Sequence, residues 1–257
     1  MAKNIDFTKL NKIIVNTGNL LSINDITKKP NQNTSEELVE AINFTLKEFG
    51  NNGSLQLQPD QQVVISRPQD NLKISEHELF DLKIGFKVFL NTDDQVLLTE
   101  AIEKALSLLK VKAINDVIVT FKQKPSEDKK DDLNTIQSAW KVLEDLIETQ
   151  QIKQIGIADV EENTFKSLYQ WAKVKPSIIQ INLATCCVVP PSLQTFCKEH
   201  DIKLLTHSDA VDILPAQSIQ NIFDKPLLLQ WALRFLIHVK CRGVLTTKGY
   251  LLKFLDQ

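Results

Sequence analysis

The stretch SIIQINLATCCVVPPSL, residues 177–193, decides the fold. Aliphatic and polar residues alternate over residues 179–184, which is the pattern of a strand with one buried face. Pro190 and the proline after it cannot donate hydrogen bonds to a sheet, so the strand ends before them. A helix capped by Ser192 is predicted to follow. A strand, a polar loop and a helix in this order are typical of one repeat of an α/β barrel.

Strands and helices alternate in the same way along the rest of the chain. A further helix is predicted over residues 227–239. Eight parallel strands separated by helices, in 257 residues, predict an α/β protein with a closed (β/α)8 TIM barrel. We expect a single domain over residues 1–257. The eight predicted strands lie in residues 12–19, 63–65, 82–90, 117–121, 155–158, 177–184, 203–207 and 243–247.

Composition excludes several classes of protein. Hydrophobic residues make up 43% of the chain and charged residues 24%, as in an ordinary globular protein. A net charge of −2, without a basic stripe carrying aromatic residues, argues against nucleic acid as a partner. No apolar run is long enough to cross a membrane, and the first residues lack an apolar leader. We therefore expect a cytoplasmic protein with no membrane partner, whose four cysteines are reduced thiols.

Common catalytic and ligand-binding motifs are absent from the sequence. Seven glycines form neither a dinucleotide-binding G-x-G-x-x-G nor a phosphate-binding loop, and no G-x-S-x-G elbow occurs. Cys197 and His200 have the spacing of a ligand pair, but a structural zinc site needs four ligands. We therefore predict no metal site.

Residues 83–257 resemble the aldo-keto reductase superfamily. The resemblance is carried by residues 140–146 and 153–157, which are similar to the helix and strand before that superfamily's cofactor loop. Residues 175–182 are similar to its strand that faces the nicotinamide. The resemblance implies an aldo-keto reductase-like barrel.

A closer resemblance, running nearly end to end, is to the modifier (regulatory) subunits of glutamate–cysteine ligase, which share that barrel. It implies a non-catalytic subunit that binds the ligase's catalytic subunit as a heterodimer. That subunit makes γ-glutamylcysteine from glutamate, cysteine and ATP, the first step of glutathione synthesis. The resemblance further implies that the modifier raises the apparent affinity for glutamate and relieves inhibition by glutathione. The matching segments are residues 17–19, 168–176, 180–191, 204–207 and 239–250.

The resemblance also identifies which reductase residues this chain lacks. Reductases of the superfamily use an Asp, a Tyr, a Lys and a His, with the Tyr as general acid. Lys87 stands at the Lys position, but Phe121 stands at the His position and cannot bind a carbonyl. The two tyrosines are predicted on an outer helix (Tyr169) and after the last strand (Tyr250). No catalytic residue is therefore expected, and Lys87 is expected to be buried and paired with a carboxylate.

Some of the residues that contact the cofactor in the superfamily are also replaced in this chain. Asp159 stands where reductases place an Asn for the carboxamide, and His207 stands where an aromatic ring stacks on the nicotinamide. Gln180 is kept. Lys87, Gln180, His207 and Ser208 would then line a vestigial pocket that binds NADPH weakly, if at all.

Three functions stay open at this point: a regulatory ligase subunit, an NADPH-dependent carbonyl reductase, and a barrel that senses nucleotides or redox state. The missing Tyr disfavours the second.

Cys186 and Cys187 are two adjacent thiols in the loop after the sixth predicted strand. Adjacent cysteines rarely bond to each other, because the ring would be strained. We expect one to be buried and the other accessible. The resemblance implies that this pair forms a redox-sensitive disulfide between the subunits, with Cys241 as a weaker alternative.

Overall fold

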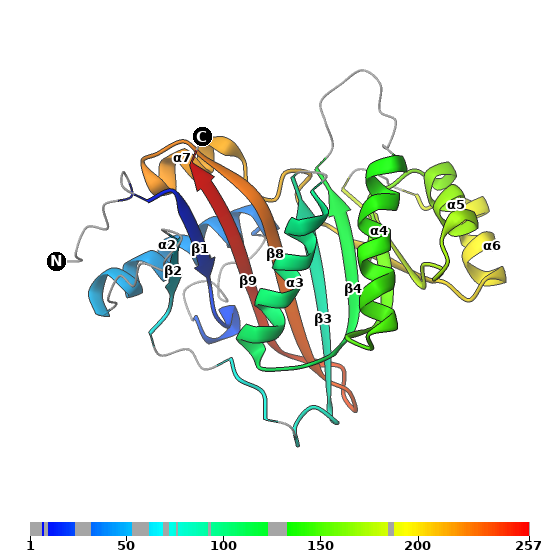
Figure 1. Ribbon diagram of the computed structural model, residues 1–257, viewed down its shortest axis with the longest axis horizontal. Helices are drawn as coiled ribbons and strands as arrows, with labels where there is room; N and C mark the ends of the chain where they lie inside the picture. Colours follow the sequence, from blue (N-terminus) through cyan, green and yellow to red (C-terminus); the bar gives the residue numbers. More distant parts are fainter. Residues whose placement is uncertain are drawn as a thin grey trace.

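The computed structural model describes most of the chain, and these residues form one nine-stranded mixed sheet in the order β2-β1-β9-β8-β3-β4-β5-β6-β7 (Figure 1). The described residues are 7, 10–23, 32–52, 62–68, 72–75, 77–91, 94–122, 133–184 and 188–256. The strands are β1 (Lys12–Asn16), β2 (Gln62–Ser66), β3 (Leu82–Leu90), β4 (Ile114–Phe121), β5 (Ile152–Ala158), β6 (Ile178–Asn182), β7 (Lys203–His207), β8 (Leu227–Val239) and β9 (Val244–Asp256). The helices are η2 (Leu20–Ser22), α2 (Thr34–Asn52), α3 (Gln95–Leu109), α4 (Leu133–Glu148), α5 (Glu162–Trp171), α6 (Pro191–Glu199) and α7 (Ala216–Phe223).

The middle of the chain is built as the sequence predicts. From β3 to β7 each strand pairs in parallel with the next, and one helix connects each pair. Most residues of β3, β4 and β5 are buried on both faces, as in parallel strands covered by helices, whereas β7 is largely exposed. The predicted α/β class, with the strand–helix alternation of a TIM-type barrel, is confirmed.

The C-terminal segment differs from the prediction. Residues 227–239 form the long strand β8, not a helix, and β8 runs antiparallel to both β3 and β9. The run is apolar almost throughout, so its periodicity cannot separate a buried strand from a buried helix. β3 and β9 satisfy its backbone on both edges, which decides in favour of the strand. The last predicted strand is found as β9, but it continues to Asp256.

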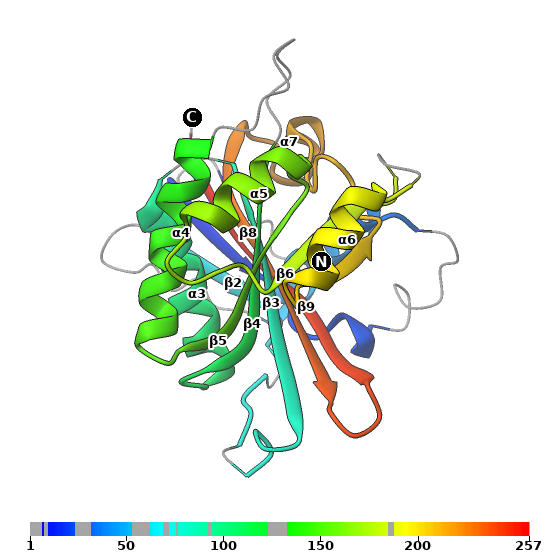
Figure 2. The same cartoon turned by 90° about the vertical axis from the view of Figure 1, so that its right-hand side faces the viewer.

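The sheet has two ends, so it does not close into a ring of eight parallel strands. β2 pairs with β1 alone and β7 with β6 alone, and within the described ranges no ladder joins β2 to β7. The strands instead follow a strongly twisted sheet (Figure 2). The β8–β9 hairpin separates β1 from β3 and shifts the first two strands away from β7.

Two hydrophobic cores lie on the two faces of this sheet. The first packs α3, α4 and α5 against β3 to β6 and includes the fully buried Trp140. The second packs α2 and α7 against β1, β2 and β9. Figure 1 shows α3 and α4 in front of the sheet and α2 behind it. The residues of α3 from Leu97 to Leu109 recur with the helical period as an apolar stripe, and this stripe is buried in the first core.

Two predicted helix caps are not used, and both residues have other partners. Ser192 lies inside α6, after the cap residue Pro190, and its hydroxyl donates to Glu162. Asp159, which the spacing Asp159-x-x-Glu162 predicts as the cap of α5, lies before the cap residue Glu161. Because Asp159 does not cap α5, its carboxylate can contact other residues at the end of the sheet.

Candidate functional site

A buried carboxylate, Asp209, joins side chains from three strands on the α2 face of the sheet. Lys87 of β3 and Arg234 of β8 are directly opposite each other in the antiparallel ladder. Like charges in that position repel. Asp209, two residues after β7, lies between them: Lys87 Nζ is 2.8 Å from Oδ2, and the Arg234 guanidinium donates to both carboxylate oxygens. All three residues are less than 10% exposed.

The cluster continues through His207 to two further strands. The His207 ring lies between two carboxylates, with Nδ1 3.0 Å from Asp209 Oδ2 and Nε2 2.8 Å from Asp159 Oδ1. The hydroxyl of Thr120 at the end of β4 donates to the other Asp159 oxygen at 3.1 Å. Asp159 has a φ of +63°, a left-handed conformation that Asp tolerates better than most residues. This turn points its carboxylate across the ends of β4 and β7.

Tyr250 extends the cluster on the other side. It is the residue opposite Arg234 in the β8–β9 ladder, so Lys87, Arg234 and Tyr250 form one row across three strands. The Tyr250 hydroxyl donates weakly, at 3.4 Å, to Glu37 of α2, which also pairs with Lys248. The row links β3 to α2 through the protein interior.

The environment shifts the pKa values of these groups, favouring the charged forms of Asp209 and His207 but disfavouring that of Lys87. Burial would raise the pKa of Asp209, but the hydrogen bond with His207 and the Arg234 charge hold it well below its usual range. Burial would lower the pKa of His207, but hydrogen bonds to Asp159 and Asp209 outweigh burial and raise it. Burial lowers the pKa of Lys87, and Asp209 offsets this only in part. The cluster is therefore a self-neutralising ionic network.

The pocket residues predicted from the sequence differ in their burial and in their partners. Lys87 is buried and paired with a carboxylate, as predicted, and His207 reaches the same carboxylate. Gln180 of β6 has a buried amide oxygen with no hydrogen-bond partner among the described residues. Ser208 is exposed. Cys186 and Cys187 lie outside the described residues.

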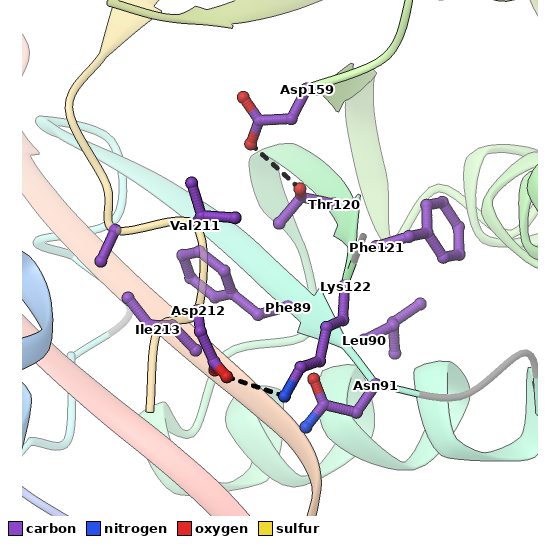
Figure 3. A pocket seen from close by; sticks show the side chains of 11 residues that line it. Phe89, Leu90, Asn91, Thr120, Phe121, Lys122, Asp159, Val211, Asp212 and Ile213 are labelled. Carbon is purple, nitrogen blue, oxygen red and sulfur yellow. Dashed lines mark hydrogen bonds and ion pairs between the residues drawn. The ribbon is translucent and has the colours of Figure 1, made fainter. Parts of the chain in front are cut away.

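A small cavity lies at the carboxyl ends of β3, β4 and β5. The cavity there has a volume of about 30 Å³, whereas ligand pockets usually have about 300–1,000 Å³. The loop after β7 closes it with Val211, Asp212 and Ile213 (Figure 3). Asp159, which stands where reductases bind the carboxamide, already holds His207 and Thr120. The unpartnered oxygen of Gln180 is the one feature that would suit the cofactor.

Metal and membrane features can be stated for the described residues only. They contain no group of three or more His, Cys, Asp or Glu side chains arranged to hold a metal ion. None of the helices in these ranges has the length and apolar character needed to span a bilayer.

Comparison with known proteins identifies the family. No family model matches the chain. It is 34% identical over 255 residues to the glutamate–cysteine ligase regulatory subunit of Homo sapiens, covering 92% of this chain and 90% of that protein. The Mus musculus protein of the same name is 34% identical over 249 residues, with the same coverage. The chain belongs to the glutamate–cysteine ligase regulatory subunit family.

Solved structures add little to this assignment. An aldose reductase from Giardia lamblia is similar over 68% of this chain and 53% of its own, at 18% identity and a TM-score of 0.38. A superposition this partial carries no weight for function.

The structure places Phe121 and the two tyrosines as follows. Phe121 ends β4 and lines the small cavity. Tyr169 lies on α5, where its ring packs against Phe196 and His200. Tyr250 lies within β9, not after the last strand as predicted, and burial raises its pKa. A reductase needs the opposite shift for its general acid.

Sequence reasoning missed Asp209, Arg234 and the partners of Asp159. One signal was available for Arg234: it is the single charged residue in the apolar run of β8. A lone charge in such a run indicates a buried ion pair. Asp209 gives no local signal, since its role depends on β3 and β8 being neighbours.

Proposed function

We propose that this chain is the non-catalytic regulatory subunit of a glutamate–cysteine ligase. It binds the catalytic subunit, raises the apparent affinity of that subunit for glutamate and relieves inhibition by glutathione. The observation that carries the proposal is identity of 34% over 92% of the chain to proteins named as regulatory subunits of this ligase. The match also covers 90% of the relative, so the proposal rests on nearly the whole of both proteins.

The contacts of the residues at the positions of a reductase active site support a non-catalytic role. Lys87 is paired with Asp209. It has no tyrosine to activate, because the hydroxyl of Tyr250 is directed to Glu37 and Tyr250 lies beyond Arg234 in the row. The position of the catalytic His holds Phe121. The small volume of the cavity beside Phe121, about 30 Å³, supports the same role. The ionic network thus stabilises the sheet where a reductase would hold its cofactor and substrate.

The proposed regulation has a simple thermodynamic requirement. A partner that binds one conformation of the catalytic subunit better than another shifts the population toward the first. If that conformation binds glutamate more tightly and glutathione less tightly, both effects follow from the one binding event. Couplings of this kind are typically about 5-fold to 150-fold in affinity.

The proposal is tested by binding and activity measured on the same sample. The purified chain and the catalytic subunit are mixed at equal concentrations and followed by analytical ultracentrifugation, alone and together. We expect a 1:1 complex, and ATP-dependent formation of γ-glutamylcysteine only when the catalytic subunit is present. Two independent sedimenting species at micromolar concentration, with unchanged kinetics for glutamate, would contradict the proposal.

A further inference from the structure

Among the described residues the sheet ends at β7, and no strand pairs with the outer edge of this strand. The backbone N–H of Lys203 and the C=O of His207 bond to the β6 side. Because successive residues of a strand point their backbone groups to opposite edges, those of Leu204 and Thr206 point away from β6. None of the described strands pairs with that side. An edge of this kind is a template for another strand.

β7 has few of the features that protect an edge strand. It has no proline and no bulge, and its single lysine, Lys203, lies at its start and bonds to Gln154. Leu205 is 41% exposed, and Leu183, directly after β6, is 47% exposed. An exposed edge without a bulge or an inward-pointing charge can pair with a strand of another chain. Further exposed apolar residues near the ends of β6 and β7 are Val188 and Val211.

A groove runs beside this edge on the α6 face of the sheet. Its volume is about 470 Å³, and Leu204 of β7 lies on one side of it and α6 on the other. Figure 1 places α6 at the end of the molecule farthest from α2. The helix that follows β7 in the chain, α7, packs on β8 and α2 and so leaves the groove open. The lining residues are Val189, Gln194, Cys197, Lys198, Ile202 and Leu204.

The charge of the groove indicates what its occupant must carry. Lys198 is the single charged residue of the lining, and it is exposed. In the described ranges no carboxylate forms an ion pair with it. The remaining lining is apolar apart from Gln194. A complementary occupant therefore has an extended backbone, an apolar side chain for the groove and a carboxylate for Lys198.

We propose that the β7 edge and this groove bind an extended, apolar segment of the catalytic subunit that carries an acidic side chain. The segment adds to the sheet as a strand, and Leu204 and Thr206 donate and accept its main-chain hydrogen bonds. One of its apolar side chains enters the groove beside Leu204, and its carboxylate pairs with Lys198. This inference rests on the proposed function, because it names the surface through which the subunits associate.

The backbone bonds are tested at Thr206, whose side chain is exposed. Thr206→Pro removes the outward N–H. It should leave the ladder with β6 intact, because the backbone groups of residue 206 point to the edge opposite to those of Lys203 and His207. Thr206→Val is the matched control, which keeps the N–H. We expect Thr206→Pro to weaken binding of the catalytic subunit at least tenfold and Thr206→Val to change it less than threefold. Circular dichroism checks that both fold.

The charge is tested separately, so that a misfolded proline variant leaves the inference testable. Lys198→Glu should weaken binding at least fivefold. Lys141→Glu, an equal charge reversal at an exposed position of α4, should leave binding unchanged. Hydrogen exchange of the wild-type complex should show slower exchange over residues 203–207 than in the free chain.

The outcomes separate this inference from the proposed function. If the wild-type chain does not bind the catalytic subunit, the proposed function fails. If it binds, and folded Thr206→Pro and Lys198→Glu bind as well as wild type, the docking site is wrong while the function stands. A free wild-type chain that is a dimer, and that Thr206→Pro converts to a monomer without affecting the catalytic subunit, would assign the edge to a second copy and overturn the inference.

Discussion

Replacing Asp209 with Asn should destabilise the fold far more than an ordinary surface change. The substitution keeps the shape of the side chain but removes the charge that neutralises Lys87 and Arg234, which are directly opposite in the β3–β8 ladder. Removing one partner of a buried ion pair costs about 3–5 kcal/mol, because the remaining charge is buried without compensation. Burial already lowers the pKa of Lys87, so loss of its proton limits the cost. We therefore expect about 3 kcal/mol, or a loss of about 6–12 °C in Tm for a domain of this size.

The matched control is Asp212→Asn in the same loop. Asp212 pairs with Lys122 at 2.8 Å, but both side chains are about one-third exposed or more. Exposed pairs contribute about 0–1 kcal/mol. Urea denaturation followed by circular dichroism gives the free energy of unfolding of both variants at pH 7. In addition, Lys87→Met in the Asp209→Asn background should recover part of the loss, because it removes one uncompensated charge. Equal, small losses for Asp209→Asn and Asp212→Asn would refute the idea that Asp209 neutralises a buried cation pair.

Three further predictions concern the same network, the former cofactor site and the thiols. The folded pKa of His207 is raised above its usual value of about 6.5, so its contribution to stability is fully present below that pH and is lost as pH rises through the folded pKa. The difference in unfolding free energy between wild type and His207→Gln should shrink with rising pH, and a constant difference would contradict this. The purified chain should not oxidise NADPH with aldehydes at 340 nm, and turnover that disappears in a folded Lys87→Met variant would show that it is a reductase. The double change Cys186→Ser, Cys187→Ser should leave the complex intact in reducing buffer but remove an oxidised heterodimer band on non-reducing gels, and persistence of that band together with its loss in Cys241→Ser would assign it to the other thiol.

The parts of the fold that the sequence predicts are those set by local pattern. The stripe of α3 is visible because the helix buries one face with its own period. The alternation of residues 179–184 locates β6, but the expectation of one buried face is wrong, because Ile178 and Asn182 are buried as well as Ile179 and Ile181. β8 was assigned to the wrong class because its residues are buried on both sides, so no period marks it. Its place between β3 and β9 depends on pairing between segments far apart in the chain. The open end of the sheet at β7 follows from that pairing and was likewise not predictable.

The candidate site likewise contains residues that the sequence predicts and residues that it does not. Lys87 and His207 were found through the resemblance to a known family, and the structure brings both to Asp209. Gln180 lies on β6, where the resemblance puts it, but its amide oxygen has no partner in the described residues. Arg234 was hidden in a segment assigned to a helix. A site assembled from β3, β7 and β8 becomes visible only when the order of the strands is known.

The most direct test of the regulatory role is the inhibition constant of glutathione for the ligase reaction. It is measured on the catalytic subunit alone and with one equivalent of this chain, at fixed cysteine and ATP and several glutamate concentrations, after ultracentrifugation has verified the complex. The account predicts that the chain raises the inhibition constant and lowers KM for glutamate, each by about fivefold or more. An unchanged inhibition constant in a verified stoichiometric complex would contradict it.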